Sequence, residues 1–262
     1  MLNIIKSFFN AKKEKRAIIY YGQNMDYAKI QDIDYIIVQP NHIDTKKTEF
    51  TSNRENIYAY VSIGEITSQV KEYKYIESEW IISSNPDWQS EVLDIKNSEY
   101  HNFLFQRIID PILELGFKNL FFDTLDSYNI AVKIESERKL YELVLSKLLY
   151  KIHKKYPEVK LILNRGFEII ERVAPYIEAV LFESYYFGLD SEPGKYKKIS
   201  DADREWLHIY IDKIKELGID VIALDYLDEK EMSRANEAIK IIKAKGMIPY
   251  VSNRDLDIYG EG

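Results

Sequence analysis

Two acidic residues stand at the ends of short apolar runs, where they could cleave a glycosidic bond. Asp123 ends the run Leu120–Asp123 (LFFD), and Glu183 ends the run Ala179–Glu183 (AVLFE). Glycoside cleavage needs one carboxyl group that protonates the leaving oxygen and a second that attacks the anomeric carbon or activates water. Asp123 and Glu183 are therefore predicted as a catalytic pair. The alternative for Asp123 is an ion pair with a neighbouring loop.

Asp126 follows Asp123 by three residues, so two like charges would share one strand end. Such a pair holds a proton, meets a cation or binds a cationic substrate, because like charges raise each other's pKa. We predict Asp126 as a substrate contact, while capping of the next helix explains it equally well. No metal site is predicted, because no histidine or third clustered acid accompanies the two aspartates.

Other polar and aromatic residues follow the same kind of apolar run and are predicted to line a substrate site. Asn164 could hydrogen-bond a sugar hydroxyl, Asp225 could pair with an amino group, and Tyr226 could stack on a sugar ring. Each could equally cap a loop or a turn. The remaining predicted substrate contacts are Tyr21, Ser62, Glu65, Tyr128, Tyr185 and Arg254.

These residues need a frame that brings the ends of several strands together. Eight short apolar runs alternate with helix-like stretches, which predicts parallel strands joined by crossover helices. The runs are nearly continuous in apolar residues, as expected for strands covered on both faces. The predicted strands are Ala17–Gly22, Tyr35–Pro40, Ile57–Ile63, Leu120–Asp123, Val159–Leu163, Ala179–Glu183, Val221–Asp225 and Ile248–Val251.

The length of 262 residues is ordinary for one closed α/β barrel, which needs about 250. We therefore expect a single (β/α)8 TIM barrel over residues 17–262, after an N-terminal lead-in segment over residues 1–16. No helix-length stretch follows the eighth run, so the final helix is expected to be incomplete. The lead-in segment is expected to form an amphipathic helix that covers this open side.

Helical spacing marks the stretches between the strands, and glycines follow several of them, as is typical of helix ends. The segment Ile66–Glu99 is long for a barrel loop and is predicted to be an insertion over the strand ends. The predicted helices are Tyr100–Leu115, Ile130–Tyr156, Phe167–Tyr176, Asp201–Leu217 and Lys230–Lys245, and glycines stand at 116, 218 and 246.

Composition narrows the possible partners. The chain has 36 basic and 43 acidic residues, a net charge of −7, which gives no general attraction for nucleic-acid phosphates. Cysteine is absent and only four histidines occur, which excludes a thiolate site and argues against a multi-histidine metal site. No run reaches the ~20 apolar residues of a membrane span. The 21 tyrosines fit a site for sugar rings, although many are expected in the core.

Seven ordered motifs carry a resemblance to a known family. The sequence resembles the endo-α-1,4-polygalactosaminidase family of glycoside hydrolases and the related hydrolase domain of the bacterial Pel polysaccharide deacetylase-hydrolase. The resemblance runs from about the first strand to the C-terminus. The motifs are YVSIGE, NPDWQSEVLDI, GFKNLFFDTLDSY, LILNRG, VLFESYYFG, ALDYL and IPYVSNRDLDI.

The resemblance implies a barrel hydrolase that cleaves a partly deacetylated, cationic galactosamine exopolysaccharide such as occurs in biofilms. It implies Asp123 as nucleophile, or as base if the enzyme inverts, and Glu183 as general acid/base. Two carboxylates and water suffice, so no cofactor is expected. Family members are typically exported or attached to the envelope, whereas the N-terminus here has no recognisable signal peptide.

Two alternatives remain, and the first belongs to another functional class. A non-catalytic polysaccharide-binding barrel would need the aromatic residues but no working acid pair. A hydrolase of another amino-sugar glycan would keep the acid pair and differ in its loops, above all in Ile66–Glu99. The sequence leaves the retaining or inverting outcome and the oligomeric state open.

Overall fold

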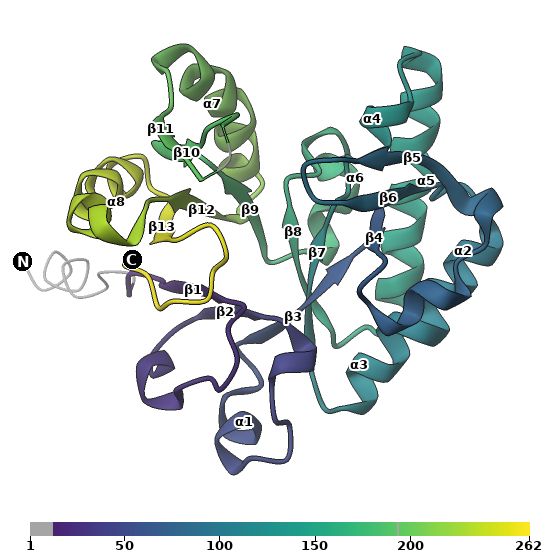
Figure 1. Cartoon of the computed structure of the whole chain (residues 1–262), viewed down its shortest axis with the longest axis horizontal. Helices are drawn as coiled ribbons and strands as arrows, with labels where there is room; N and C mark the ends of the chain where they lie inside the picture. The colour runs from purple at the N-terminus through teal and green to yellow at the C-terminus, as the bar shows by residue number, and fades with distance from the viewer. Residues whose placement is uncertain (1–12, 193) are drawn as a thin grey trace, which may run out of the picture.

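Eight parallel strands form a nearly closed barrel in the computed structural model, which describes residues 13–192 and 194–262 (Figure 1). Hydrogen-bonded neighbours follow the order β1-β2-β3-β7-β8-β9-β12-β13. Each predicted apolar run forms one of these strands, so the predicted TIM barrel is confirmed. The strands are β1 (Ala17–Tyr20), β2 (Tyr35–Val38), β3 (Ile57–Ser62), β7 (Asn119–Asp123), β8 (Lys160–Asn164), β9 (Ala179–Glu183), β12 (Asp220–Tyr226) and β13 (Ile248–Ser252).

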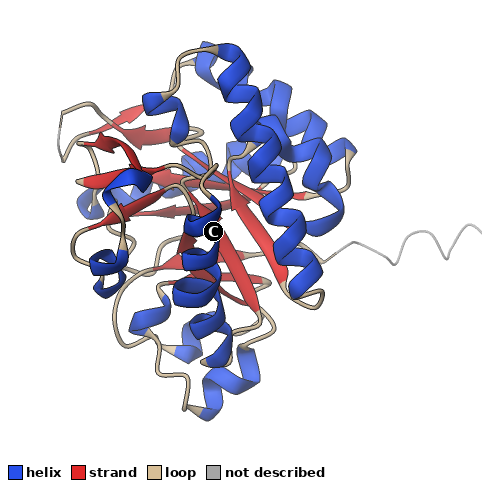
Figure 2. Ribbon diagram, turned by 90° about the vertical axis from the view of Figure 1, so that its right-hand side faces the viewer, coloured by secondary structure: helices blue, strands red, loops and turns tan. Residues whose placement is uncertain are grey.

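The strands are buried on both faces, which explains their continuous apolar sequence. All four residues of β2 are buried, with Ile36, Ile37 and Val38 fully inaccessible. One set of alternate residues fills the barrel interior and the other set packs under the helices, which line the outer side of the strands (Figure 2). This alternation decides which residues at the strand ends can reach a central site.

The helices lie between the strands, close to their predicted places. Gly218 and Gly246 follow α7 and α8 with φ of 77° and 70°, the left-handed conformation that ends a helix at low cost for glycine. The α-helices are α1 (Thr48–Asn53), α2 (Ser98–Phe103), α3 (Asp110–Glu114), α4 (Tyr128–Ala131), α5 (Glu135–Lys155), α6 (Ile170–Val173), α7 (Asp201–Glu216) and α8 (Ala235–Ala244).

Short 3-10 helices and one π-helix complete the helical segments. The π-helix η6 joins α2 to α3, so the predicted helix Tyr100–Leu115 is continuous but bulged. The predicted helix Ile130–Tyr156 is divided into α4 and α5. These segments are η2 (Tyr27–Ile30), η3 (Pro40–His42), η4 (Lys71–Tyr75), η5 (Ser78–Trp80), η6 (Leu104–Ile109), η7 (Phe167–Ile169), η8 (Ala174–Tyr176) and η9 (Glu229–Arg234).

The segment Ile66–Glu99 forms a small antiparallel sheet with its own hairpin. Its strands are β4 (Glu65–Thr67), β5 (Ile81–Asn85) and β6 (Ser90–Leu93), in the order β4-β6-β5. A second, two-stranded sheet of β10 (Phe187–Leu189) and β11 (Tyr196–Lys198) follows β9. Both sheets extend loops that leave the carboxyl ends of barrel strands.

The C-terminal tail lies along the seam between β13 and β1. Glu261 exchanges two backbone hydrogen bonds with Val251 of β13, and the carbonyl of Leu256 accepts from the N–H of Tyr21, just after β1. The Tyr259 ring stacks on Tyr20 at 4.4 Å, and Figure 1 shows the tail returning beside β1. As expected, no helix follows β13 within residues 253–262.

The predicted N-terminal covering helix lies mostly on residues 1–12, outside the described residues. Of the lead-in segment, residues 13–16 are described, and the Lys15 amino group pairs with Asp220 at the start of β12. Among the helices that the structure describes, none is long and apolar enough to cross a membrane.

Candidate active site

Asn164 connects the two predicted catalytic acids directly. Asp123, Asn164 and Glu183 are the last residues of the adjacent strands β7, β8 and β9. The Asn164 Nδ2 group donates to Asp123 Oδ1 at 2.7 Å and to Glu183 Oε1 at 2.9 Å. One nitrogen touches both oxygens, so their separation cannot exceed the sum of these two distances, about 5.6 Å. The acids therefore face one another across a single reaction centre.

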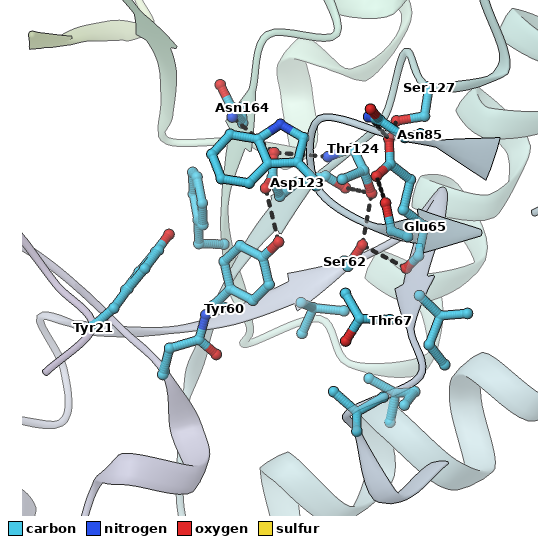
Figure 3. A pocket seen from close by; sticks show the side chains of 18 of the residues that line it. Tyr21, Tyr60, Ser62, Glu65, Thr67, Asn85, Asp123, Thr124, Ser127 and Asn164 are labelled. Atoms are coloured by element: carbon cyan, nitrogen blue, oxygen red, sulfur yellow. Dashed lines mark hydrogen bonds between the residues drawn. The ribbon is translucent and has the colours of Figure 1, made fainter. Parts of the chain in front are cut away.

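Tyrosine hydroxyls hold the outer oxygens of the pair. Tyr60, on β3, donates to Asp123 Oδ2 at 2.8 Å, and Tyr226, on β12, donates to Glu183 Oε2 at 2.8 Å. Figure 3 shows the Tyr60 hydroxyl pointing at Asp123 from below. Burial, followed by the charges of the nearby acids, raises the pKa of both tyrosines well above its usual value. Both hydroxyls therefore stay protonated and act as donors.

Burial also changes the titration of the aspartate. Burial, followed by the neighbouring Glu183 charge, raises the pKa of Asp123 to about 6. The hydrogen bonds from Tyr60, Asn164 and the Thr124 N–H act in the opposite direction, because they stabilise the carboxylate. Asp123 is consequently an anion above about pH 6, in a site where a charge is poorly solvated.

A left-handed residue follows each of the three strand ends. Thr124, Arg165 and Ser184 have φ of 61°, 57° and 64°. This conformation is strained for residues with a side chain, above all for a β-branched threonine, and such strain concentrates at functional sites. The three turns redirect the chain immediately after the functional side chain, which leaves Asp123, Asn164 and Glu183 at the open edge of the barrel.

The Thr124 side chain compensates for this strain with several hydrogen bonds. Its Oγ1 accepts from the backbone N–H of Ile63 and Gly64 at 3.1 and 2.8 Å, and it lies 2.8 Å from Ser62 Oγ. The Thr124 N–H donates to Asp123 Oδ1 at 2.8 Å. Thr124 thus ties the loop after β3 to the catalytic aspartate.

A cavity of about 1110 Å³ opens above these residues at the carboxyl ends of the strands. It is lined by most of the predicted site residues, which is where barrel enzymes place their chemistry. Within residues 13–192 and 194–262, no group of three or more acids and histidines is placed to hold a metal ion. The predicted residues that line the cavity are Tyr21, Ser62, Glu65, Asp123, Asp126, Asn164, Glu183, Tyr226 and Arg254.

Glu65 lines this cavity, but its carboxylate is occupied by protein donors. It is only 7% exposed. Its Oε1 accepts from Asn85 Nδ2 at 3.0 Å and from Ser127 Oγ at 2.5 Å, and its Oε2 accepts from Ser90 Oγ. Figure 3 shows this cluster beside the Asp123 group. Glu65 therefore fixes the insertion to the loop after β7.

The prediction that Asp225 binds an amino group of the substrate is wrong for this structure. Alternate residues of β12 face opposite sides, and Tyr226 faces the cavity, so Asp225 faces outward. Asp225 is fully buried, and its carboxylate accepts from the backbone N–H groups of Tyr185, Tyr186 and Phe187. It holds the loop that follows Glu183.

Tyr128 and Tyr185 also lie away from the cavity, contrary to prediction. Tyr128 is 4% exposed and stacks on Tyr141 at 4.9 Å. Tyr185 is 1% exposed, and its hydroxyl lies 2.7 Å from His208 Nε2 on α7. The left-handed Ser184 ends the strand alternation, so the position of Tyr185 relative to Glu183 does not indicate where its ring points.

Tyr60 and Thr124 are functional contacts that were not predicted from the sequence. A signal for Tyr60 exists, because it precedes the predicted contact Ser62 by two residues on one strand and must share its face. For Thr124 no comparable signal exists, since its role depends on a left-handed backbone that threonine rarely adopts.

Comparison with known families gives a match over nearly the whole chain. The sequence model of glycoside-hydrolase family GH114 matches residues 11–261. An uncharacterised protein of Methanocaldococcus jannaschii, MJ1477, is 25% identical over 222 residues, which cover 76% of this chain. The chain spans 62% of the length of that relative.

Two solved structures are similar over most of their length. The glycoside hydrolase domain of PelA from Pseudomonas aeruginosa is 25% identical, with a TM-score of 0.83 over 93% of this chain and 96% of that domain. Ega3 from Aspergillus fumigatus, in complex with galactosamine, is 12% identical with a TM-score of 0.67, covering 93% of this chain and 92% of Ega3. At that identity the second likeness concerns the fold alone.

Proposed function

This chain belongs to glycoside-hydrolase family GH114, and from that premise we propose that it hydrolyses an amino-sugar polysaccharide by double displacement at Asp123 and Glu183. The observation that carries the proposal is the Asn164 bridge, which limits the nearest oxygens of the two acids to about 5.6 Å. Retaining glycosidases hold their carboxyl groups about 5 to 5.5 Å apart, while inverting enzymes need about 6.5 Å or more to admit a water molecule.

In the first step, Asp123 attacks the anomeric carbon while Glu183 donates a proton to the departing glycosidic oxygen. A covalent glycosyl ester forms on Asp123 and the leaving part of the polymer departs with the proton. Asp123 is assigned as the nucleophile because three donors stabilise its charge, from Tyr60, Asn164 and the Thr124 N–H. Glu183 accepts from Asn164 and Tyr226.

In the second step, water hydrolyses the ester. Glu183, now a carboxylate, removes a proton from the water, whose oxygen attacks the anomeric carbon. The bond to Asp123 breaks, and the aspartate leaves as an anion that the same three donors stabilise. The product keeps the anomeric configuration of the substrate, since each displacement inverts it once.

The proposed substrate is an α-1,4-linked galactosamine polymer that is partly deacetylated and is cleaved within the chain. The ordered motifs that resemble the endo-α-1,4-polygalactosaminidase family support this class of sugar, and the likeness to the PelA domain supports a glycoside hydrolase. Asp126 lines the cavity near the catalytic loop and supplies a carboxylate for a substrate ammonium group.

A panel of purified amino-sugar polymers tests this function. The native chain should release new reducing ends from a partly deacetylated galactosamine polymer. The double variant Asp123→Asn, Glu183→Gln should release none and gives the background of the assay. Polymer binding without any release of reducing ends would replace the hydrolase with a binding protein. Release from a glucosamine polymer alone would reassign the sugar and keep the mechanism.

A further inference from the structure

Trp88 is an exposed aromatic side chain on the rim of the catalytic cavity. It lies in the four-residue tip, residues 86–89, of the hairpin between β5 and β6. Its side chain lines the same cavity as Asp123 and Glu183, yet 53% of it is exposed. A large exposed indole beside a cavity gains free energy when a ligand covers it, and its flat face suits the C–H face of a sugar ring.

The protein holds this hairpin tip firmly. Asn85 and Ser90 flank the tip on its two sides, and both donate to the buried carboxylate of Glu65. Gln89, next to Trp88, is held in a left-handed conformation with φ of 50°. A side chain on an ordered hairpin tip loses little conformational freedom when a ligand binds, so the entropy cost of binding at Trp88 is small.

Arg254 approaches the indole from a loop that is far from Trp88 in the sequence. It follows β13, and its guanidinium carbon lies 5.2 Å from the centre of the Trp88 ring. Arg254 also lines the cavity. No carboxylate of the described residues forms an ion pair with it, so its positive charge is not cancelled locally. The loops after β3 and β13 thus meet over the cavity through one cation–π contact.

The charged side chains around the cavity do not all favour a cationic polymer. Both catalytic carboxylates and Asp126 would attract an ammonium group, whereas Arg254 would repel one held against Trp88. The other lining residues carry charges of both signs. The acids among them are Glu65, Glu72 and Asp255, and the bases are Lys71, Arg107, Lys133 and Arg165.

We propose that Trp88 and Arg254 form a sugar subsite that accepts a neutral ring, such as an N-acetylated residue, and rejects a residue with a free ammonium group. The sugar's C–H face stacks on the exposed part of the indole, and Arg254 both orients the indole and donates hydrogen bonds to carbonyl or hydroxyl oxygens. The identity of the sugar rests on the proposed function, whereas the subsite itself is inferred from the contact between Trp88 and Arg254.

Polymer binding by the inactive Asp123→Asn protein tests the platform without cleavage. Calorimetry with a partly N-acetylated galactosamine polymer should give a Kd about 10-fold weaker when Trp88→Ala is added, since base or ring stacking on an aromatic residue is worth about this much. Trp88→Phe should restore binding to within about 3-fold. Trp206→Ala is the matched control, because Trp206 is 50% exposed but lies on α7, outside the cavity, and should leave the Kd unchanged.

Arg254→Gln tests the selection against charge. In the Asp123→Asn protein it should strengthen binding of a fully deacetylated polymer by about 5-fold, because it removes one repulsive charge. It should weaken binding of the N-acetylated polymer, because hydrogen bonds from the guanidinium are lost. An unchanged ratio of the two Kd values would overturn the selection. Equal binding by Trp88→Ala and its parent, or no binding of either polymer to the parent, would overturn the subsite.

Failure of the subsite and failure of the proposed function give different results in these experiments. Reducing ends report on hydrolysis, while calorimetry of the inactive protein reports on the platform. A chain that releases no reducing ends but loses binding on Trp88→Ala would keep the subsite and lose the hydrolase. A chain that cleaves the polymer but binds it equally with Trp88→Ala would keep the hydrolase and lose the subsite.

Discussion

Asp123 is half-buried and Asp225 is fully buried, both near the carboxyl ends of barrel strands, and loss of solvation raises the pKa of each to about 6. They differ in the side of the sheet that they face. Asp123 points into the cavity, where its donors are Tyr60, Asn164 and one backbone N–H. Asp225 points outward, is fully inaccessible, and accepts only from backbone N–H groups among the described residues.

A raised pKa therefore does not by itself identify a catalytic aspartate. Backbone N–H groups surround Asp225 on the buried outward side of the strand. Its carboxylate therefore stabilises a loop and is not accessible to a ligand. Side-chain donors hold Asp123 from one side and leave the other open to the cavity. The open side, together with a second acid bridged through Asn164, distinguishes the chemical role from the structural one.

The largest expected difference between the two aspartates is in activity. Asp123→Asn should lower the rate of polymer cleavage by about 10⁴-fold or more, because it removes the nucleophile. Asp225→Asn should keep the rate per folded molecule within about 10-fold, because its side chain only supports a loop. Reducing-end assays on both proteins, normalised to the folded fraction by circular dichroism, measure this. A similar loss in both variants would erase the distinction.

The next difference is in stability, and here Asp225 is the sensitive position. Asp225→Ala should lower the free energy of unfolding by about 3 to 5 kcal/mol, because three buried N–H groups lose their acceptor. Urea unfolding followed by fluorescence measures it. Asp225→Asn keeps one acceptor oxygen and should cost less, and a loss below about 1 kcal/mol for the alanine variant would contradict the structural role.

Asp123→Asn should have the opposite effect on stability. The folded protein holds this proton more tightly than the unfolded chain, because its pKa is about 6 in the fold against an ordinary value of 3.8, so ionisation of Asp123 opposes folding once the pH rises above these values. The variant should be about 2 kcal/mol more stable than the native chain at pH 7. This gain should shrink as the pH falls from 6 to 4, because native Asp123 becomes protonated. A gain that does not vary with pH would have another cause.

The smallest effect concerns the pH dependence of catalysis. Tyr60→Phe removes a hydrogen bond that lowers the pKa of Asp123, so the acidic limb of the kcat/KM profile should move to higher pH by about half a unit to one unit. Tyr21→Phe is the control, since Tyr21 packs edge-on against Tyr60 at 5.5 Å without donating to Asp123. A shift in the control alone would contradict the assignment.

The barrel and most of its site could be predicted because strand burial leaves a strong pattern in the sequence. Every predicted apolar run became a strand of the barrel, and Asp123, Asn164 and Glu183 followed from their places at the strand ends. Asp225 and Tyr226 are neighbours on one strand and therefore face opposite sides, so the sequence alone excludes that both contact the substrate.

Other features depend on contacts that sequence patterns do not carry. The ring of Tyr185 is directed by the left-handed Ser184 before it, and Glu65 is occupied by donors from segments 20 to 62 residues away. The meeting of Trp88 and Arg254 joins two loops far apart in the chain. Such long-range pairs follow only from the closed barrel, which brings all strand ends to one face.

The anomeric configuration of the first product tests the central claim most directly. Proton NMR should follow early cleavage of the α-linked galactosamine polymer by the native chain, before the new reducing ends mutarotate. The α anomer should appear first and the β anomer should follow at the rate of mutarotation, because Asp123 and Glu183 lie close enough for double displacement. Initial release of the β anomer would contradict it.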